Sequence, residues 1–339
     1  MHKEKLLGYT LSEVELVLTD LEVSPLLARE VCIWMYRRGC HSFLQMKSIP
    51  SEVRHKLDAK FSIESLQPQS SQTSKDETSK YLFTTENGNP FETAYMPSGK
   101  RNTLCISTQS GCQMGCSFCY TGSLGLIENL STAQILSQLL AIPQRQQVNR
   151  IVLMGMGEPL ENPDNTFRTL EILNAQWGFS FGAANITLST VGIIPQLERL
   201  VNSRYCNIAI SLHSPFAKQR SDILPSENSY PIENIVDFFR QHPLKKPLRL
   251  SFEYVVVPGE NDSQGHANGV SELLSDLKCH VNVIPLNSKK SNNTLVKAAR
   301  VFQQKLNQCG TPATLRLSRG HDIDAACGMM AGNSIGKKN

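Results

Sequence analysis

The sequence predicts an α/β fold in which a partial TIM-type (β/α)6-like barrel follows a small N-terminal helical module. From residue 103 onward, short apolar segments alternate with segments whose apolar residues recur at helical spacing. This alternation is typical of parallel strands joined by crossover helices, in an open sheet or in a barrel. Polar or glycine residues follow nearly every predicted strand. Because the carboxyl ends of the strands in a parallel barrel meet at one mouth, these residues would surround one ligand, which favours the partial barrel.

The first 66 residues predict the helical accessory module. Apolar residues recur at helical spacing in three segments, the second beginning at Pro25 and the third after Pro50. Residues 67–80 are polar and almost free of apolar side chains, so we expect a linker or an exposed turn there. Two short strands at 81–83 and 91–96 follow. We therefore expect the accessory module at 1–66, the linker and strand pair at 67–97, the barrel at 98–333 and a tail at 334–339.

The barrel is predicted from strand candidates and the helical segments between them. Each strand candidate is a short apolar run, and each helical segment is longer and amphipathic. The strand candidates are 103–107, 150–154, 185–189, 207–211, 250–257, 280–284 and a late one at 313–317. The clearest helical segments are 131–142, 165–176, 231–241 and one near 295–306.

Composition and charge place the chain among ordinary globular proteins. Its 339 residues are 40% hydrophobic and 19% charged, which excludes a fully disordered chain, a collagen-like repeat and a disulfide-dense miniprotein. The net charge of +4 is too small to indicate a nucleic-acid partner by itself. Residues 278–339, however, carry ten Lys and Arg against two acids. That asymmetry indicates either a basic surface or a solvated face of the last helix, and charge alone does not favour one over the other.

The N-terminus is charged throughout and does not resemble a signal peptide. No apolar run approaches the roughly 20 residues of a membrane span. We therefore expect a cytoplasmic protein with no membrane partner. Ten cysteines in such a protein are expected to stay reduced, as thiols, metal ligands or catalytic residues.

Three cysteines, Cys112, Cys116 and Cys119, follow the first barrel strand at the spacing CxxxCxxC. A structural zinc site needs four ligands, usually as two CxxC pairs, and no second pair matches here. Three thiolates instead suit a [4Fe-4S] cluster in which one iron lacks a protein ligand. That open iron can bind a substrate or cofactor through an amine and a carboxylate. The spacing therefore predicts an iron–sulfur centre.

With these residues in view, the sequence resembles a known family. CxxxCxFC followed by GMGEPL is similar to radical S-adenosylmethionine (SAM) enzymes, and FETAYMP, ITLSTVG, ISLH and RGHDIDAACGMMAGN narrow the resemblance to the RlmN/Cfr family of adenosine methyltransferases. The resemblance extends to about Asn333. It implies one [4Fe-4S] cluster on the three cysteines and two SAM molecules per turnover. It also implies an RNA partner and a low-potential electron donor such as flavodoxin, and we expect a monomer.

The resemblance assigns three catalytic residues. Cys327 would be methylated by a first SAM to a thioether, and a second SAM at the cluster would be cleaved reductively to a 5′-deoxyadenosyl radical. This radical would take a hydrogen from the methyl group on Cys327, and the resulting carbon radical would add to the adenine. Glu92 would deprotonate the adduct, and Cys105 would attack Cys327 and leave a disulfide that an external reductant resets.

Each assignment has a structural alternative. A lone cysteine such as Cys327 is more often a buried core residue, but its small neighbours leave room for two reactants. By spacing alone, Cys105 belongs equally to the core of the first barrel strand. Glu92 is by position an outward-facing strand residue, whereas the apolar, aromatic stretch FETAY around it favours a general base. The family resemblance favours the catalytic interpretation of all three.

The resemblance also assigns SAM-binding residues at the strand ends. Gly157 would allow close approach of the backbone to the amino-acid end of SAM, and the carboxylate of Glu158 would pair with its ammonium. Without the family, GMGEPL is a weak signal that also fits a tight strand–helix turn, and a lone histidine such as His213 is more often structural. The remaining assigned residues are Ser189, Ser211, Leu212 through its backbone, His213, and Asn287 at the adenine.

The resemblance thus predicts methylation at C2 of an adenosine in ribosomal RNA, and also in transfer RNA. One alternative is methylation at C8, as in the Cfr branch, with resistance to ribosome-targeting antibiotics. Another is an iron–sulfur RNA-binding protein that has lost catalysis, against which the presence of all three catalytic residues argues. Tyr120 and the short segment after Asn287 depart from the family pattern near the expected mouth, where substrate choice is decided.

Overall fold

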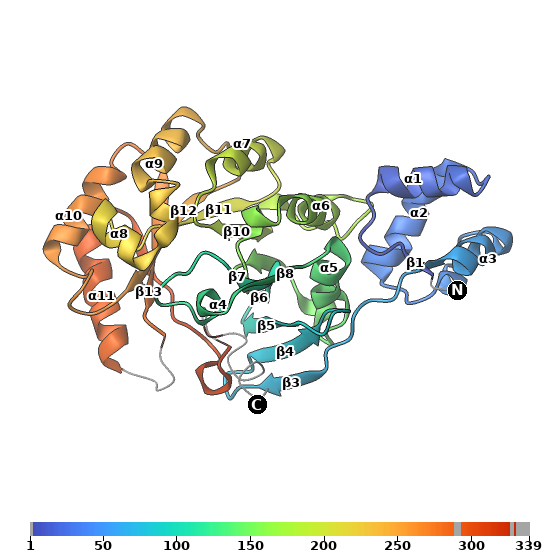
Figure 1. The fold of residues 1–339 in the computed structure, drawn as a ribbon, viewed down its shortest axis with the longest axis horizontal. Coiled ribbons are helices and arrows are strands. Elements are labelled where there is room, and N and C mark those ends of the chain that lie inside the picture. Colours follow the sequence, from blue (N-terminus) through green and yellow to red (C-terminus); the bar gives the residue numbers. More distant parts are fainter. Residues whose placement is uncertain (1–2, 288–292, 326–328, 330–339) are drawn as a thin grey trace.

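The structure is a computed structural model that describes residues 3–287, 293–325 and 329. Its central element is an open sheet, ten-stranded within these residues (Figure 1). The strands are β3 Ser70–Thr73, β4 Ser79–Thr84, β5 Pro90–Ser98, β6 Arg101–Ile106, β9 Arg150–Leu153, β10 Ile186–Thr190, β11 Asn207–Ser211, β12 Leu250–Val256, β13 Cys279–Pro285 and β14 Ala313–Leu315. Their spatial order is β14-β13-β12-β11-β10-β9-β6-β5-β4-β3, so β14 and β3 form the two edges.

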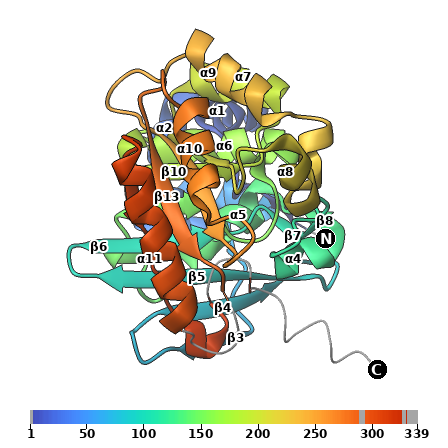
Figure 2. The ribbon, with the colours of Figure 1, turned by 90° about the vertical axis from the view of Figure 1, so that its left-hand side faces the viewer.

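The parallel part of the sheet confirms the predicted α/β class. Strands β6 and β9 to β14 are parallel, and each overlaps one of the strand candidates. Crossover helices cover the outer face of these strands (Figure 1, Figure 2). The helices are α5 Thr132–Leu140, α6 Pro163–Asn174, α7 Ile194–Ser203, α9 Ile232–Gln241, α10 Gln264–Leu273 and α11 Asn293–Gln308. A further helix, α8 Ala217–Ile223, lies at the carboxyl end of β11.

The segment expected as a linker or turn contains a strand. Residues 70–73 form β3 and pair antiparallel with β4, although all four side chains are exposed. An edge strand with no side chain in the core is held by the backbone hydrogen bonds of one neighbour, so hydrophobic patterning gives no sign of it. The expected strand pair is present as β4 and β5, and β5 pairs with β6. The antiparallel strands therefore extend the parallel sheet.

The N-terminal module lies at one end of the molecule (Figure 1). It contains α1 Leu11–Asp20, α2 Ala28–Cys32, which continues as a π-helical turn at Ile33–Arg38, and α3 Ser51–Lys60. Short parallel strands β1 Glu4–Lys5 and β2 Phe61–Ser62 close the module. Tyr36 of the module packs against Phe179 of the barrel, with ring centroids 5.7 Å apart, and Arg145 Nη2 donates to the Arg37 carbonyl oxygen at 2.7 Å. Aromatic packing and hydrogen bonds thus join the module to the barrel.

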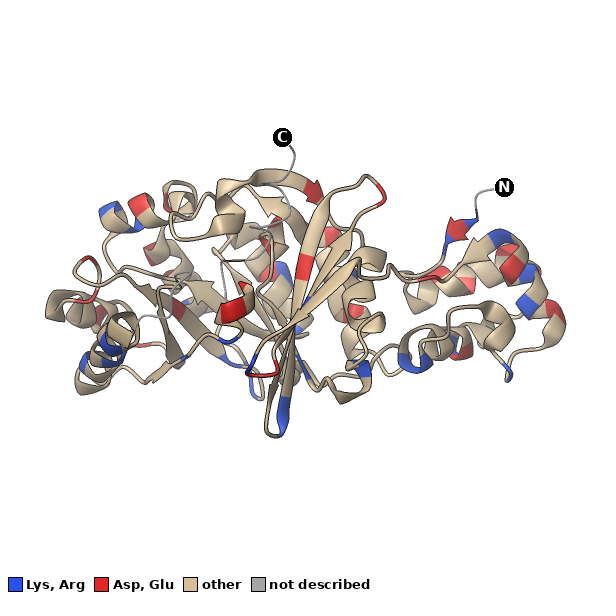
Figure 3. Ribbon diagram, turned by 90° about the horizontal axis from the view of Figure 1, so that it is seen from below, with Lys and Arg blue, Asp and Glu red and all other residues tan. Residues whose placement is uncertain are grey.

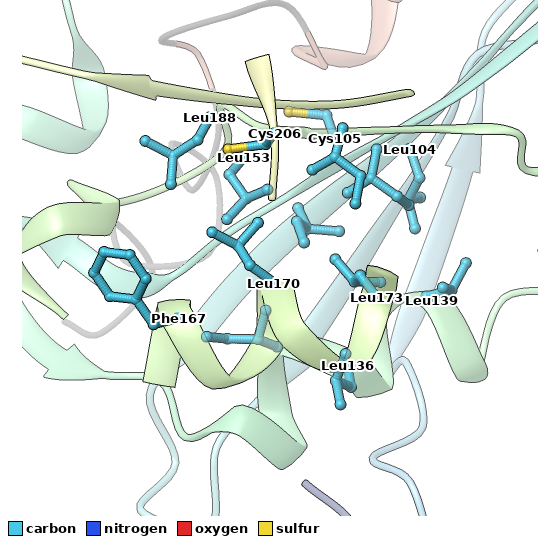
Figure 4. Packing of buried hydrophobic residues seen from close by; sticks show 14 of the residues in the cluster. Leu104, Cys105, Leu136, Leu139, Leu153, Phe167, Leu170, Leu173, Leu188 and Cys206 are labelled. Atoms are coloured by element: carbon cyan, nitrogen blue, oxygen red, sulfur yellow. The ribbon is translucent and has the colours of Figure 1, made fainter. Parts of the chain in front are cut away.

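The sheet separates an apolar outer side from a more polar inner side. Figure 4 shows Leu104, Leu153 and Leu188 of adjacent strands against leucines of α5 and α6, whereas Cys105 lies on the other side of β6. Because side chains alternate along a strand, the register defines which residues share the side of Cys105. We call this side the inner face. It includes Lys80, Glu92, Cys105, Val152, Ser189, Ser211, Glu253 and Asn282.

Charged side chains of both signs are mixed over the module and the barrel (Figure 3). On α11, Lys297 and Arg300 are exposed, while Lys305 Nζ donates to the Asp262 carbonyl oxygen at 2.7 Å. The last helix therefore presents a solvated basic face. Among the described residues, no helix combines the length and the hydropathy that crossing a membrane requires.

Candidate active site

A cavity opens at the carboxyl ends of the parallel strands, where the polar strand-end residues predicted a ligand. Its empty volume, the open mouth included, is about 790 Å³. Most of the predicted cluster and SAM residues line it together: Cys112, Cys116, Cys119, Gly157, Glu158, Ser189, Ser211 and His213. Of the predicted residues that the structure describes, Leu212 is fully buried behind this wall, Asn287 lies two residues beyond β13, and neither lines the cavity.

A hairpin places the first cysteine. Cys112 ends β7 Gln109–Cys112, which pairs with β8 Gly125–Asn129. At Gly111 φ is +75°, and a Cβ there would lie 2.0 Å from the Gly125 carbonyl oxygen. Only glycine combines that backbone conformation with so close an approach. The glycine before the first cysteine is therefore required by the hairpin.

A loop tied to α8 places the other two cysteines. The Cys119 amide donates to the Cys116 carbonyl oxygen at 3.0 Å. The Ser117 amide donates to the Ile223 carbonyl oxygen at 2.9 Å, at the end of α8. The loop geometry thus depends on a helix that lies a hundred residues further along the chain.

Three thiols are the donor set that a [4Fe-4S] cluster with one iron lacking a protein ligand would take. Within the described ranges, no three His, Cys, Asp or Glu side chains converge on a point where one ion would bind. In a [4Fe-4S] cluster each thiolate ligates a different iron, so the ligands surround a group of atoms instead. Burial raises the pKa of Cys112 to about 12, and it also raises the pKa of Cys116. The nearby Cys119 raises both pKa values further through its charge. A buried thiol with a raised pKa loses its proton when a cation lies beside it, because the cation stabilises the thiolate. The iron of a cluster would supply that positive charge.

The turn after β9 places Gly157 and Glu158 at the base of the cavity. At Gly157 φ is +98°, and a Cβ would lie 2.5 Å from the Cβ of Gln109, so the two backbones approach closely. The carboxylate oxygens of Glu158 accept hydrogen bonds from the Leu160 amide at 3.0 Å and the Val191 amide at 2.9 Å. Burial raises the pKa of Glu158 to about 7 despite these hydrogen bonds. The carboxylate therefore also ties the end of β9 to the end of β10.

His213, just after β11, is held neutral. Its Nδ1 accepts a hydrogen bond from the Val255 amide at 3.1 Å, so the ring proton is on Nε2. Burial, and then the charge of Arg220, lower the pKa of His213 to about 3. Its φ of +59° is supported by Asn261, whose side-chain amide donates to the His213 carbonyl oxygen at 2.8 Å. An edge contact with Phe118, at 4.7 Å between centroids, joins the ring to the cysteine loop.

A buried arginine that the sequence analysis did not identify joins two groups of site residues. Arg220 of α8 is fully buried, and it donates to the Leu212 carbonyl oxygen at 3.1 Å and to that of Ser211 at 2.7 Å. It also forms an ion pair with Glu227. Since the Ile223 end of the same helix holds the cysteine loop, Arg220 connects that loop to the end of β11. No sequence signal marks it, because arginine in a polar helical segment is ordinarily exposed.

Glu253 and Arg316 form a further part of the cavity wall. Glu253 on β12 lies opposite Ser211, and one of its carboxylate oxygens accepts a hydrogen bond from the Asn282 side chain at 2.7 Å. Arg316 Nη1 lies 3.6 Å from the other oxygen. The charged residue inside the apolar strand candidate LSFEYVVV is the signal that would have identified Glu253.

Glu92 and Cys105 share the inner face, although their surroundings differ from the expectation. Cys105 pairs with Ala94 across β5 and β6, and Glu92 lies two residues before Ala94 on the same side. Glu92 does not lie in an apolar environment, because Lys80 Nζ is 3.2 Å from its carboxylate and both side chains are less than 10% exposed. The aromatic neighbour Phe91 lies on the opposite face of β5. Strand alternation therefore separates Glu92 from its aromatic sequence neighbours.

Cys327, predicted as the methyl carrier, lies outside the described residues. The chain before it is described as far as Ala325. That segment leaves β14 and contacts the turn between β3 and β4 through Arg319 and Gly320.

Comparisons with known proteins agree with this geometry. Residues 106–267 match the profile of the radical SAM superfamily, and residues 4–63 match that of the N-terminal domain of ribosomal RNA large subunit methyltransferases. The chain is 37% identical to a probable dual-specificity RNA methyltransferase RlmN of Parabacteroides distasonis, over 97% of each chain. It is 38% identical to the dual-specificity RNA methyltransferase RlmN of Geobacter sulfurreducens, over 96% of this chain and 91% of that one. It also resembles the crystal structure of a radical SAM methyltransferase from Sphaerobacter thermophilus, with a TM-score of 0.88 and 37% identity over 96% of this chain and 98% of that one.

Proposed function

This chain belongs to the RlmN family of radical SAM RNA methyltransferases, and we propose that it methylates C2 of adenosine in ribosomal RNA and transfer RNA. The observation that carries the proposal is the convergence of the three cysteines and the strand-end residues on one cavity, on a sheet whose inner face also holds Glu92 and Cys105. The relatives from Parabacteroides distasonis and Geobacter sulfurreducens are both named RlmN, so methylation at C8 is not favoured.

In this proposal Cys112, Cys116 and Cys119 hold the [4Fe-4S] cluster that the radical SAM family implies. Gly157 and Ser211 of the cavity wall would bind SAM, supported by Leu212 behind the wall and by Asn287 beyond β13. When bound, the cluster and SAM supply one-electron chemistry that generates a carbon-centred radical. Because only three cysteines would ligate the cluster, one position on it would be open to SAM. Each turnover would use two SAM molecules.

The protein's own residues carry the remaining steps. Cys327 carries the transferred carbon as a thioether and becomes bonded through it to the adenine. Glu92 accepts the proton from C2, and Lys80 stabilises the carboxylate that accepts it. The Cys105 thiolate then attacks the Cys327 sulfur, so that an S–S bond forms as the bond between that sulfur and the transferred carbon breaks. The released carbon takes up a proton from solvent to become the methyl group, and the unpaired electron left by the radical addition passes to the electron-transfer partner. An external thiol reductant returns both cysteines to the reduced form.

The setting of the reaction completes the proposal. The protein works in the cytoplasm as a monomer, and a low-potential donor such as flavodoxin supplies the electron. RNA approaches from the mouth of the cavity; the exposed Tyr120 lies in sequence between Cys119 and Thr121, which line it.

Nucleoside analysis tests the proposal. RNA from cells with and without the gene is digested and separated by mass spectrometry against 2-methyladenosine and 8-methyladenosine standards. We expect 2-methyladenosine to disappear without the gene; loss of 8-methyladenosine instead would establish the Cfr-type reaction. Anaerobically purified protein that contains no iron and no sulfide would overturn the cluster assignment.

A further inference from the structure

The last described segment joins the two edges of the open sheet. After β14, at one edge, the chain runs to the turn between β3 and β4, at the other edge (Figure 1, Figure 2). We call residues 319–325, together with the turn 74–78, the clasp. It begins three residues after Arg316 of the cavity wall, and Ala325 precedes Cys327 by two residues. Along the chain, the clasp therefore lies between the cavity and the proposed methyl carrier.

Asp76 is at the centre of the clasp. Its Oδ2 accepts a hydrogen bond from the Gly320 amide at 3.1 Å and lies 3.4 Å from Arg319 Nε. Its Oδ1 accepts one from the Thr78 amide at 3.0 Å, which fixes the orientation of the carboxylate. Arg319 Nη2 also donates to the Asp76 carbonyl oxygen at 3.0 Å. Hydrogen bonds with a charged partner are roughly twice as strong as neutral ones. The Asp76 carboxylate therefore contributes strongly to the contact between the turn and residues 319–320.

The other contacts of the clasp pack its far end. Asp322 accepts hydrogen bonds from the Lys75 amide at 3.2 Å and from the Ser74 hydroxyl. At Gly320 φ is +65°, and a Cβ would lie 2.7 Å from the Cβ of Ala325. The Ala325 amide donates to the Gly320 carbonyl oxygen at 3.0 Å, and Ala325 is only 4% exposed. The backbone is thus held in one conformation up to Ala325.

We infer that Asp76 is a positioning residue for the methyl carrier Cys327. The inference rests on the proposed function, in which the Cys327 sulfur meets SAM, an adenine and Cys105 in turn. Such transfers require reacting atoms within about 3–3.5 Å, and a misplacement of 1 Å can reduce the rate about a hundredfold. A segment anchored at Asp76 restricts the positions open to a residue that follows Ala325 by two. Loss of the carboxylate removes its contacts with Arg319 Nε and with the Gly320 amide, while the cysteine loop lies on other elements.

The test uses the full-length, cluster-loaded enzyme with SAM, dithionite and ribosomal RNA from cells that lack the gene. The variants are Asp76→Asn and Arg319→Ala, and the matched control is Glu77→Gln, an exposed carboxylate in the same turn. We measure the ratio of 5′-deoxyadenosine released to 2-methyladenosine formed, hydrogen–deuterium exchange of residues 319–325, and iron content. Both clasp variants should raise the ratio about tenfold or more and speed exchange, with iron content unchanged, while the control matches wild type.

The outcomes separate the inference from the proposed function. Faster exchange together with a wild-type ratio in Asp76→Asn would show a purely structural contact and overturn the inference. If Asp76→Asn fails to fold, a folded Arg319→Ala variant decides in the same way, and an unchanged ratio there overturns it. Wild-type enzyme that forms no methyladenosine would overturn the proposed function, and the inference with it.

Discussion

Replacing Lys80 by methionine tests the buried ion pair that holds the proposed general base. Lys80 Nζ lies 3.2 Å from the Glu92 carboxylate, and the two side chains are 8% and 5% exposed. At an effective dielectric constant of about 20, two unit charges at this distance attract by about 5 kcal/mol. Removing one partner of a buried pair typically costs about 3–5 kcal/mol, because the other charge stays buried without its cation. At about 2.1 cal/mol/K of unfolding entropy per residue, this loss lowers the Tm of a 339-residue chain by about 4–7 °C.

Thermal unfolding of the anaerobic protein measures this change. The double variant Lys80→Met/Glu92→Met should recover most of the Tm, since an apolar pair can replace a buried ion pair. It should still form no methyladenosine, because the base is absent. Lys100→Met, at an exposed lysine in the turn between β5 and β6, is the control and should leave the Tm unchanged. A Tm of Lys80→Met within about 1 °C of wild type would refute the reasoning.

Three further predictions concern other parts of the site. Cys327→Ala should abolish methylation with iron content intact. Cys105→Ala should instead accumulate a covalent protein–RNA adduct that survives a denaturing gel. Absence of the adduct would count against the role of Cys105 in releasing the methylated RNA. Arg220→Met leaves Glu227 buried without its cation, so we expect a loss of about 3–5 kcal/mol in urea unfolding. Burial acts to raise the pKa of Asp76, but hydrogen bonds to its carboxylate outweigh burial and hold the pKa below its usual value. Because the folded-state pKa is the lower one, this stabilisation is present above about pH 4 and is lost on acidification. The stability difference between wild type and Asp76→Asn should therefore be constant from about pH 5 to 8 and shrink below about pH 4; a difference that grows on acidification would contradict this.

The sequence predicted those features that depend on residues close together in the chain. The parallel strands in the described part of the chain bury apolar side chains, so their patterns were visible, whereas β3 has four exposed side chains and was not. Cys112, Cys116 and Cys119 are close in sequence, so their spacing alone indicated a cluster. The remaining site residues follow predicted strands, and the convergence of parallel strand ends brought most of them to one cavity.

Contacts between distant residues were decided only by the fold. Lys80 faces Glu92 because β4 and β5 pair in one register, and Arg220 reaches the end of β11 because α8 packs back on it. Asp76 meets Gly320 across 244 positions of the chain. A local pattern indicates which side of a strand or helix is apolar. The partner of a buried charge depends instead on strand order, on register and on which distant segments of the chain pack against each other. Residue spacing thus indicated which chemistry the site performs. Three-dimensional packing determined which charges and hydrogen bonds hold the site residues in place.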